Sequence, residues 1–339
     1  MSIDLFNKLN EYNNDPETKF VLLSSNNNKS FSTGGDLKEL VEKSNTSEGV
    51  TPILSSMYSL VDLIHNFKKP IISLINGFVI GSGVGISINC SHKIVSENVK
   101  WSMPENKVGY FPDVGTSYYL SKLGAIGLYL AMVGNFINSP DLLKLGLVQN
   151  HIPFHLFNQV TNDLCLSPNI SNKNDIDFIL NKYKRNLKIT KETSHIVKYN
   201  KIIQRCFNTK FNSVSEIFNK LNKELLENNN PNEKEWLVKT VTTLMNSCPT
   251  SICVSFNSVH RSLNLDLKEI LINDNRIGNR ICSRKDLFQG INGALIDKSF
   301  KPKFSPSSIY DVDQSYIDSL FLPFDNEKKE LFYHKKLYK

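Results

Sequence analysis

Two carboxylates, Glu105 and Asp113, stand in a segment that is otherwise largely apolar and reads WSMPENKVGYFPDVGTS over 101–117. Proline and glycine residues flank both acids and restrict the backbone, so the two side chains are presented in fixed positions. Burying an ionised carboxylate is costly unless the group is paired or has a task. The pair therefore suggests catalytic acids, and the alternative is an ordinary loop with two solvated acids. The segments upstream decide between these two interpretations.

Two glycine-bearing turns precede the acidic segment. The first, Gly34-Gly35-Asp36, follows a predicted buried strand over 20–23 and precedes a predicted helix with Asp36 as its N-cap. The second, over 81–85, follows an apolar run over 70–75 that also predicts a buried strand. Backbone amides at such turns can approach another group closely. Two sets of amides could bind a carbonyl oxygen that becomes an oxyanion.

Taken alone, the glycine run Gly81-Ser82-Gly83-Val84-Gly85 is a weak signal. It lacks the Gly-x-Gly-x-x-Gly spacing of dinucleotide-binding turns, and no Gly-Lys-Ser/Thr follows it as in a nucleotide-phosphate loop. Glycines that permit close helix–strand packing would explain the run equally well. The presence of both turns and the acidic segment, in this order, favours a functional interpretation.

The chain resembles the crotonase (enoyl-CoA hydratase/isomerase) superfamily in several motifs that occur in one order: Phe31…Gly34-Gly35-Asp36, Lys69-Pro70…Asn76-Gly77…Gly81-Ser82-Gly83, Met103-Pro104-Glu105 and Gly109…Phe111-Pro112-Asp113-Val114-Gly115. The segment over 111–115 and the C-terminal part are most similar to the 3-hydroxyisobutyryl-CoA hydrolase branch. The resemblance spans about residues 3–323. It implies an α/β fold, a spiral of ββα units with an α-helical C-terminal region. It also implies that the family's opening strand is truncated here.

The resemblance also implies roles for individual residues. The backbone amides of Thr33 and Ser82 match the oxyanion hole, while Glu105 and Asp113 match the catalytic acids. Further positions match the substrate-binding turns: Gly34, Gly35, Asp36, Gly81 and Gly83. Glu105 could attack a thioester directly or act as a base toward water, and both routes remain open. The expected partner is an acyl-CoA. Because CoA is part of the substrate, we expect no separate cofactor, and no metal site.

Three positions depart from the family's pattern. Gly85 stands where hydratases carry a second glutamate, which disfavours alkene hydration, and Ser82 replaces a glycine of the hydrolase branch. Met57 replaces a glutamate that contacts the substrate. The chain begins within the family's first helix, without the loop that holds CoA, so we expect weaker CoA affinity. A working enzyme and a paralogue of reduced activity stay equally open.

Two other functions remain as alternatives. One is an enoyl-CoA isomerase or hydratase-type enzyme. The other is a non-catalytic paralogue that serves as a protein of the mitochondrial small ribosomal subunit. The net charge of +7 suits a phosphate-bearing ligand. The lysines are spread along the chain without a dense arginine–aromatic patch, so the sequence gives little support to a nucleic-acid partner.

The chain has 339 residues, 40% of them hydrophobic, which is enough to bury a substantial core. We expect a core domain over 1–160, a helical region over 161–325 that packs over the active site, and a basic tail over 326–339. No apolar stretch approaches the roughly 20 residues that cross a bilayer. The six cysteines lack metal-binding spacing and predict buried thiols in a reducing compartment. A homo-oligomer is possible.

The resemblance implies a mitochondrial location. No presequence is visible in the first seventeen residues, which are acidic and contain no arginine, and the cytoplasm is the alternative. Further along the chain, Ser139 predicts a helix N-cap, Ser213 with Glu216 predicts a capping box, and the asparagines at 228–230 predict an exposed loop.

Overall fold

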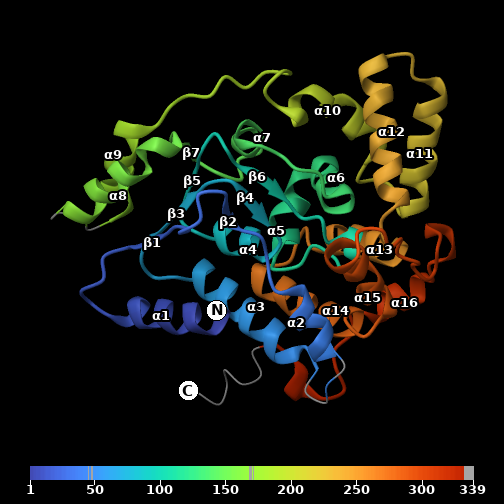
Figure 1. Cartoon of the computed structure of the whole chain (residues 1–339), viewed down its shortest axis with the longest axis horizontal. Coiled ribbons are helices and arrows are strands. Elements are labelled where there is room, and N and C mark those ends of the chain that lie inside the picture. The colour runs from blue at the N-terminus through green and yellow to red at the C-terminus, as the bar shows by residue number, and fades with distance from the viewer. Residues whose placement is uncertain (45, 47–48, 168–169, 171, 332–339) are drawn as a thin grey trace. The chain divides into compact units, whose positions relative to one another are not determined.

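The computed structural model describes residues 1–44, 46, 49–167, 170 and 172–331, and residues 332–339 of the predicted basic tail lie outside it. Figure 1 labels the helices and strands. The strands are β1 (Val21–Leu23), β2 (Ser30–Ser32), β3 (Ile71–Ile75), β4 (Phe78–Ile80), β5 (His92–Val95), β6 (Lys100–Ser102) and β7 (Asn150–His151).

The α-helices among the described residues are α1 (Ser2–Asn14), α2 (Leu37–Ser44), α3 (Thr51–His65), α4 (Ser82–Ile88), α5 (Thr116–Leu120), α6 (Ala125–Val133), α7 (Ser139–Lys144), α8 (Phe157–Leu166), α9 (Lys173–Tyr183), α10 (His195–Cys206), α11 (Val214–Glu227), α12 (Pro231–Met245), α13 (Pro249–Arg261), α14 (Leu267–Ile281), α15 (Lys285–Ile291) and α16 (Gln314–Ser319). A short 3₁₀ helix, η1 (Glu105–Val108), carries the first acid of the acidic segment. None of the described helices has the length and apolar character that a bilayer crossing requires.

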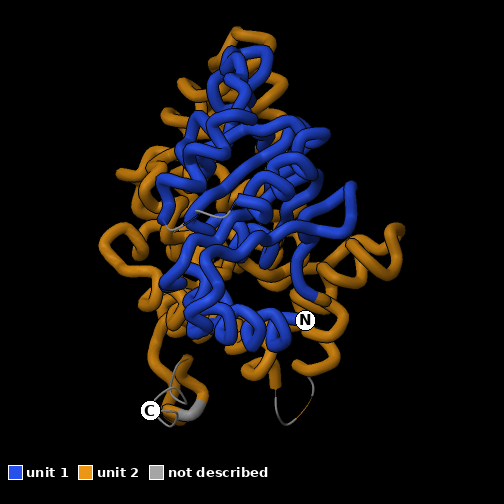
Figure 2. The backbone as a smooth tube through the Cα atoms, turned by 90° about the vertical axis from the view of Figure 1, so that its left-hand side faces the viewer, with its two compact units in different colours: residues 1–35, 59–102, 136–198 blue, residues 36–58, 103–135, 199–339 orange. Residues whose placement is uncertain are grey.

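The chain forms two compact units, each assembled from separate stretches of sequence (Figure 2). Unit 1 comprises residues 1–35, 59–102 and 136–198, and unit 2 comprises 36–58, 103–135 and 199–339. The domain boundary that we expected near residue 160 stays a prediction.

Unit 1 contains two parallel sheets built from successive strand pairs. The first strand of each pair enters a four-stranded sheet in the order β1-β3-β5-β7, and the second enters a three-stranded sheet in the order β2-β4-β6. The chain therefore alternates between the sheets as it advances, with α4 following the β3–β4 pair. This alternation is the ββα repeat that the family resemblance implied.

The core of unit 1 forms because β3 is apolar except at Ser73 and is buried along its length, as parallel strands usually are. Ile72 and Leu74 of β3 belong to a cluster that also includes Ile94 of β5 and apolar side chains of α8 and α9. The runs over 20–23 and 70–75 were predicted as buried strands. Strand β3 confirms the second prediction, whereas β1 is a strand that is buried only at Val21. The two glycine-bearing turns follow the next strands, β2 and β4.

Unit 2 is helical and has its own core. Tyr129 of α6 lies with its ring centroid 5.3 Å from that of Phe207 and 5.5 Å from that of Trp236. After residue 160 the described part of the chain contains only helices and irregular segments, as predicted. All six cysteines are free; five are buried, and Cys165 is exposed.

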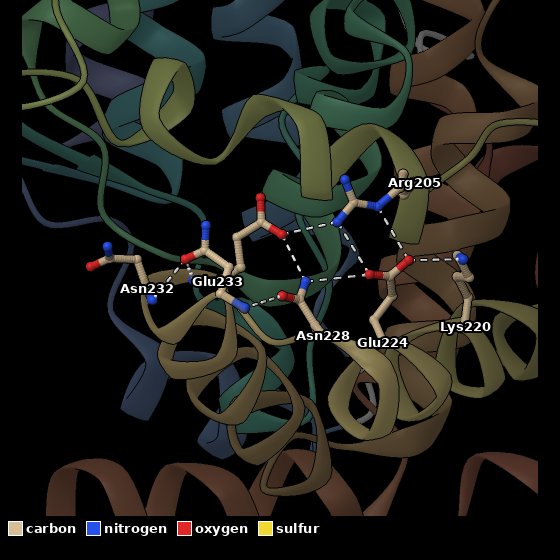
Figure 3. A network of polar contacts seen from close by, with 7 residues as sticks. Arg205, Lys220, Glu224, Asn228, Asn232 and Glu233 are labelled. Carbon is tan, nitrogen blue, oxygen red and sulfur yellow. Dashed lines mark hydrogen bonds and ion pairs between the residues drawn. The ribbon is translucent and has the colours of Figure 1, made fainter.

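One local prediction needs correction, and another is confirmed. Helix α7 is capped by Asn138 rather than Ser139, because the Asn138 side chain accepts a hydrogen bond from the Asp141 amide at 3.1 Å in a capping box. The loop predicted at 228–230 connects α11 and α12, which lie side by side in Figure 1, and its residues Asn229 and Asn230 are exposed as expected. Asn228 is half-buried and donates to Glu233 at 2.7 Å (Figure 3). Asn230 caps α12.

Candidate active site

Parallel pairing in unit 1 brings the two glycine-bearing turns together. Strands β2 and β4 are neighbours, with Ser32 opposite Val79, so the carboxyl ends of both strands lie at the same edge of the sheet. The turn after β2 includes Gly34 at φ 100°, and the turn after β4 includes Gly81 at φ 56°. Both values lie in the region that favours glycine.

The two turns are in close contact. A Cβ atom placed on Gly83 would lie 2.6 Å from the Cβ atom of Ser32, and one placed on Gly34 would lie 3.8 Å from the Ser82 nitrogen. Only glycine permits this approach at position 83. The amides of Thr33 and Ser82 therefore belong to turns that touch. Within the part of the chain that the structure describes, neither amide donates a hydrogen bond to another residue.

The remaining residues of the first turn have different surroundings. Gly35 is exposed, and Asp36, the first residue of unit 2, is exposed as well. The Asp36 carboxylate accepts hydrogen bonds from the amides of Lys38 at 2.9 Å and Glu39 at 3.2 Å. This confirms the predicted N-cap of α2 and occupies one oxygen of that side chain.

Unit 2 holds both predicted catalytic acids. Glu105 is the first residue of η1, which follows Pro104 and ends at Gly109 with φ 76°. Its side chain is buried, at 9% exposure, and its Oε2 atom has no hydrogen-bond partner among the described residues. A buried carboxylate oxygen without a partner is costly and is typical of a functional group rather than a structural one.

Asp113 is also buried, at 8% exposure, but its carboxylate is held. Its Oδ2 atom accepts a hydrogen bond from the Tyr58 hydroxyl at 2.8 Å and a longer one from the Tyr110 hydroxyl at 3.4 Å. The two hydroxyls lie 3.3 Å apart. The interpretation of the two acids as solvated loop residues is therefore excluded.

Burial dominates the electrostatics of these acids. It raises the pKa of Glu105 well above its usual range, and negative charge on Asp113 raises that pKa further. Burial raises the pKa of Asp113 to about 6, although the hydrogen bond from Tyr58 opposes that shift. Both carboxyl groups therefore release their protons at higher pH than ordinary acids do. Such groups suit general acid–base or nucleophilic chemistry.

Asn106 fixes the position of η1. Its side-chain amide donates to the carbonyls of Ala131 and Met132, each at 2.9 Å, and its Oδ1 atom accepts from the Ser255 hydroxyl at 2.7 Å. Its backbone oxygen accepts from the Cys248 amide at the start of α13. Because every polar group of this buried side chain is used, the adjacent Glu105 is held on a rigid support.

Sequence reasoning missed the residues that hold the acids, namely Tyr58, Tyr110, Asn106 and Asp274. One signal could have found the last of these. On α14 the positions of Ile270, Ile277 and Ile281 mark a buried stripe, and Asp274 lies on it. An acid on a buried stripe needs a partner or a task.

Among the described residues, no group of three His, Cys, Asp or Glu side chains is arranged so that it could hold a metal ion. Unit 1 offers two amides without a hydrogen-bond partner among the described residues, and unit 2 offers two buried carboxyl groups. These are the components of acyl-transfer chemistry.

Comparisons with known proteins identify the family. The profile of the enoyl-CoA hydratase/isomerase family matches residues 1–321, so the chain belongs to this family. Among curated relatives, the mitochondrial 3-hydroxyisobutyryl-CoA hydrolase of Xenopus laevis is 27% identical over 320 residues, which cover 94% of this chain and 80% of that protein. The protein of the same name from Dictyostelium discoideum is 31% identical over 327 residues, which cover 92% of this chain and 81% of that protein.

Solved structures support the same fold. A carnitinyl-CoA dehydratase from Mycobacterium thermoresistibile superposes with a TM-score of 0.84, covering 97% of this chain and 90% of that one, at 23% sequence identity. At this identity the match establishes the architecture and nothing about the reaction. The predicted crotonase-like α/β fold is confirmed.

Proposed function

We propose that this protein is an acyl-CoA thioester hydrolase that acts on 3-hydroxyisobutyryl-CoA. The observation that carries the proposal is the buried Glu105 carboxyl group, whose Oε2 atom lacks a partner and whose pKa is raised by burial. The names of its relatives, at 26–31% identity, support the choice of substrate. Family membership supports the acyl-CoA class.

In the proposed reaction, the amides of Thr33 and Ser82 donate hydrogen bonds to the thioester oxygen and stabilise the negative charge that develops on it. Removing one such donor typically costs roughly 10²–10³ in rate. Glu105 acts in one of two ways. It attacks the carbonyl carbon, so that the C–S bond breaks and a mixed anhydride forms for water to hydrolyse. Alternatively, it takes a proton from the attacking water and the C–S bond breaks directly.

Asp113 has a separate part in the proposal. Its Oδ2 atom is held by Tyr58, which leaves the other oxygen to orient water or the substrate hydroxyl. Gly34, Gly35, Asp36, Gly81 and Gly83 are proposed to line the substrate-binding turns. Gly83 is supported by its contact with Ser32, which keeps the two turns together.

Thiol release from 3-hydroxyisobutyryl-CoA, followed with a thiol reagent, tests the proposal. Glu105→Gln, which keeps the size of the side chain, is expected to abolish release, and Asp113→Asn to reduce it strongly. A double-bond shift in an enoyl-CoA without thiol release would favour the isomerase alternative. Co-sedimentation with small ribosomal subunits, unaffected by either substitution, would favour the scaffold alternative.

The proposed cellular role is a step of valine catabolism in mitochondria, supported by the mitochondrial names of several relatives. Fractionation of cells that express the tagged full-length protein would test the location, and a cytosolic pool alone would overturn it. A homo-oligomer is also proposed, and light scattering of the purified protein would test it.

A further inference from the structure

The turn that follows Asp113 is strained. Val114 has φ 53°, and it is the one non-glycine residue with a positive φ in the described part of the chain. A β-branched side chain strongly disfavours this region, and such strain persists only where the surroundings hold the backbone. Gly115 follows at φ 73°. The direction of the Asp113 side chain therefore depends on whatever holds this turn.

Helix α14 holds the turn from one side. The Asp274 carboxylate is buried, at 2% exposure, and its Oδ2 atom accepts a hydrogen bond from the Gly115 amide at 2.8 Å. A Cβ atom on Gly115 would lie 2.5 Å from Leu267 at the start of the same helix. The backbone just beyond the strained residue is thus both hydrogen-bonded and tightly packed against α14.

The same face of α14 supports the tyrosines that hold Asp113. Gly278 lies one helical turn after Asp274, on the same face. A Cβ atom at Gly278 would lie 2.8 Å from the Tyr110 hydroxyl and 3.3 Å from the Tyr58 hydroxyl. One stripe of α14 therefore contacts the turn after Asp113 and both hydroxyl groups that donate to its carboxylate.

We propose that Asp274 is a positioning residue for Asp113: it locks the strained Val114–Gly115 turn and so directs the Asp113 carboxylate toward Tyr58. Only the expected effect of Asp274 on catalysis depends on the proposed function. A buried acid that merely stabilises the fold would affect unfolding without changing the direction of Asp113. The experiment therefore needs one structural measurement and one kinetic measurement.

The structural measurement compares crystal structures of Asp274→Ala and Asp274→Asn. The alanine variant leaves the Gly115 amide without its acceptor, so Val114 is expected to relax to a negative φ and Asp113 to leave Tyr58. The asparagine variant keeps a side-chain oxygen that can accept the same hydrogen bond, so the turn is expected to stay. An alanine variant that retains the positive φ and the Asp113–Tyr58 contact would overturn the inference, whatever the enzyme's activity.

The kinetic measurement uses thiol release from the same variants. A misplacement of about 1 Å can cost about 10²-fold in rate. Asp274→Ala is therefore expected to lower kcat by about 10–100-fold with little change in KM, and Asp274→Asn to restore most of the loss. Lys268→Ala, a change at an exposed position of α14, is the control and is expected to retain wild-type kcat.

Gly278→Ala keeps the inference testable if the alanine variant at 274 does not fold. Alanine favours the helix, but its Cβ atom would press on Tyr110 and Tyr58. It is expected to lower kcat while the protein stays folded. A Gly278→Ala variant that folds and keeps the wild-type kcat would contradict the inference. A wild-type protein without thiol release would refute the proposed hydrolase activity alone, and the crystal structures would still decide the role of Asp274.

Discussion

The raised pKa of Asp113 predicts a pH-dependent loss of stability that one substitution should remove. The carboxyl group has an ordinary value of 3.8 and a value of about 6 in the folded protein. Since the folded state binds this proton more tightly than the unfolded state, the group stabilises the fold at low pH. That contribution disappears as the pH rises from about 4 through about 6. A shift of this size corresponds to about 3 kcal/mol.

Asp113→Asn is expected to remove this contribution, because the amide stays neutral and its oxygen can still accept a hydrogen bond from Tyr58. Urea unfolding at about pH 4 and about pH 7 measures this contribution of Asp113. The free energy of unfolding of the variant, relative to wild type, should rise by about 2–3 kcal/mol between these two pH values. Taking this difference cancels the titration of shared groups that lie far from Asp113. It does not cancel that of Glu105 and Asp274, whose pKa values the charge on Asp113 raises in the wild type.

Glu227→Gln is the matched control, since it removes an exposed carboxylate from α11 and should leave the pH dependence nearly unchanged. A variant at Asp113 with the same pH dependence as wild type would refute the reasoning. In that case the carboxyl group would be solvated, and its burial could not be the cause of a raised pKa.

Two further substitutions test the packing of the turns and the polar network of unit 2. Gly83→Ala should lower the free energy of unfolding by about 1–3 kcal/mol, because the new Cβ atom would lie 2.6 Å from the Cβ atom of Ser32. Gly35→Ala is the control, since a Cβ atom at that position has room. Chemical denaturation compares the two variants. Arg205→Gln should cost at most about 1 kcal/mol at low ionic strength and less at high salt. The reason is that the Arg205 side chain, which bonds to Glu224 and Glu233 (Figure 3), is 41% exposed. A loss that is independent of salt would contradict the electrostatic explanation.

The sequence predicted the parts of the fold that depend on local pattern. Apolar runs identified β1 and β3, glycines located the turns at Gly34 and Gly81, and the serine at 213 located the start of α11. The cap of α7 was misplaced by one residue because Asn138 and Ser139 are both good capping residues. Periodicity and turn preferences depend on residues that are close in sequence, so a single sequence is enough to predict them.

The surroundings of the two acids could not be predicted in the same way. Tyr58 and Asp274 approach the acidic segment from α3 and α14, which are distant in sequence, and nothing local to either residue indicates its partner. The positive φ of Val114 could not be predicted from the sequence either, because valine ordinarily avoids that conformation. Only the assembled fold shows which buried groups have partners and that the Oε2 atom of Glu105 has none.

The rate of thiol release from Ser82→Pro, compared with Ser82→Ala, tests the central claim most directly. Ser82 is the first residue of α4, where proline fits the helix but has no N–H to donate, whereas alanine keeps that N–H. If this amide stabilises the oxyanion, the proline variant should lose roughly 10²–10³ in kcat and the alanine variant should remain close to wild type. Equal rates for the two variants would contradict the account.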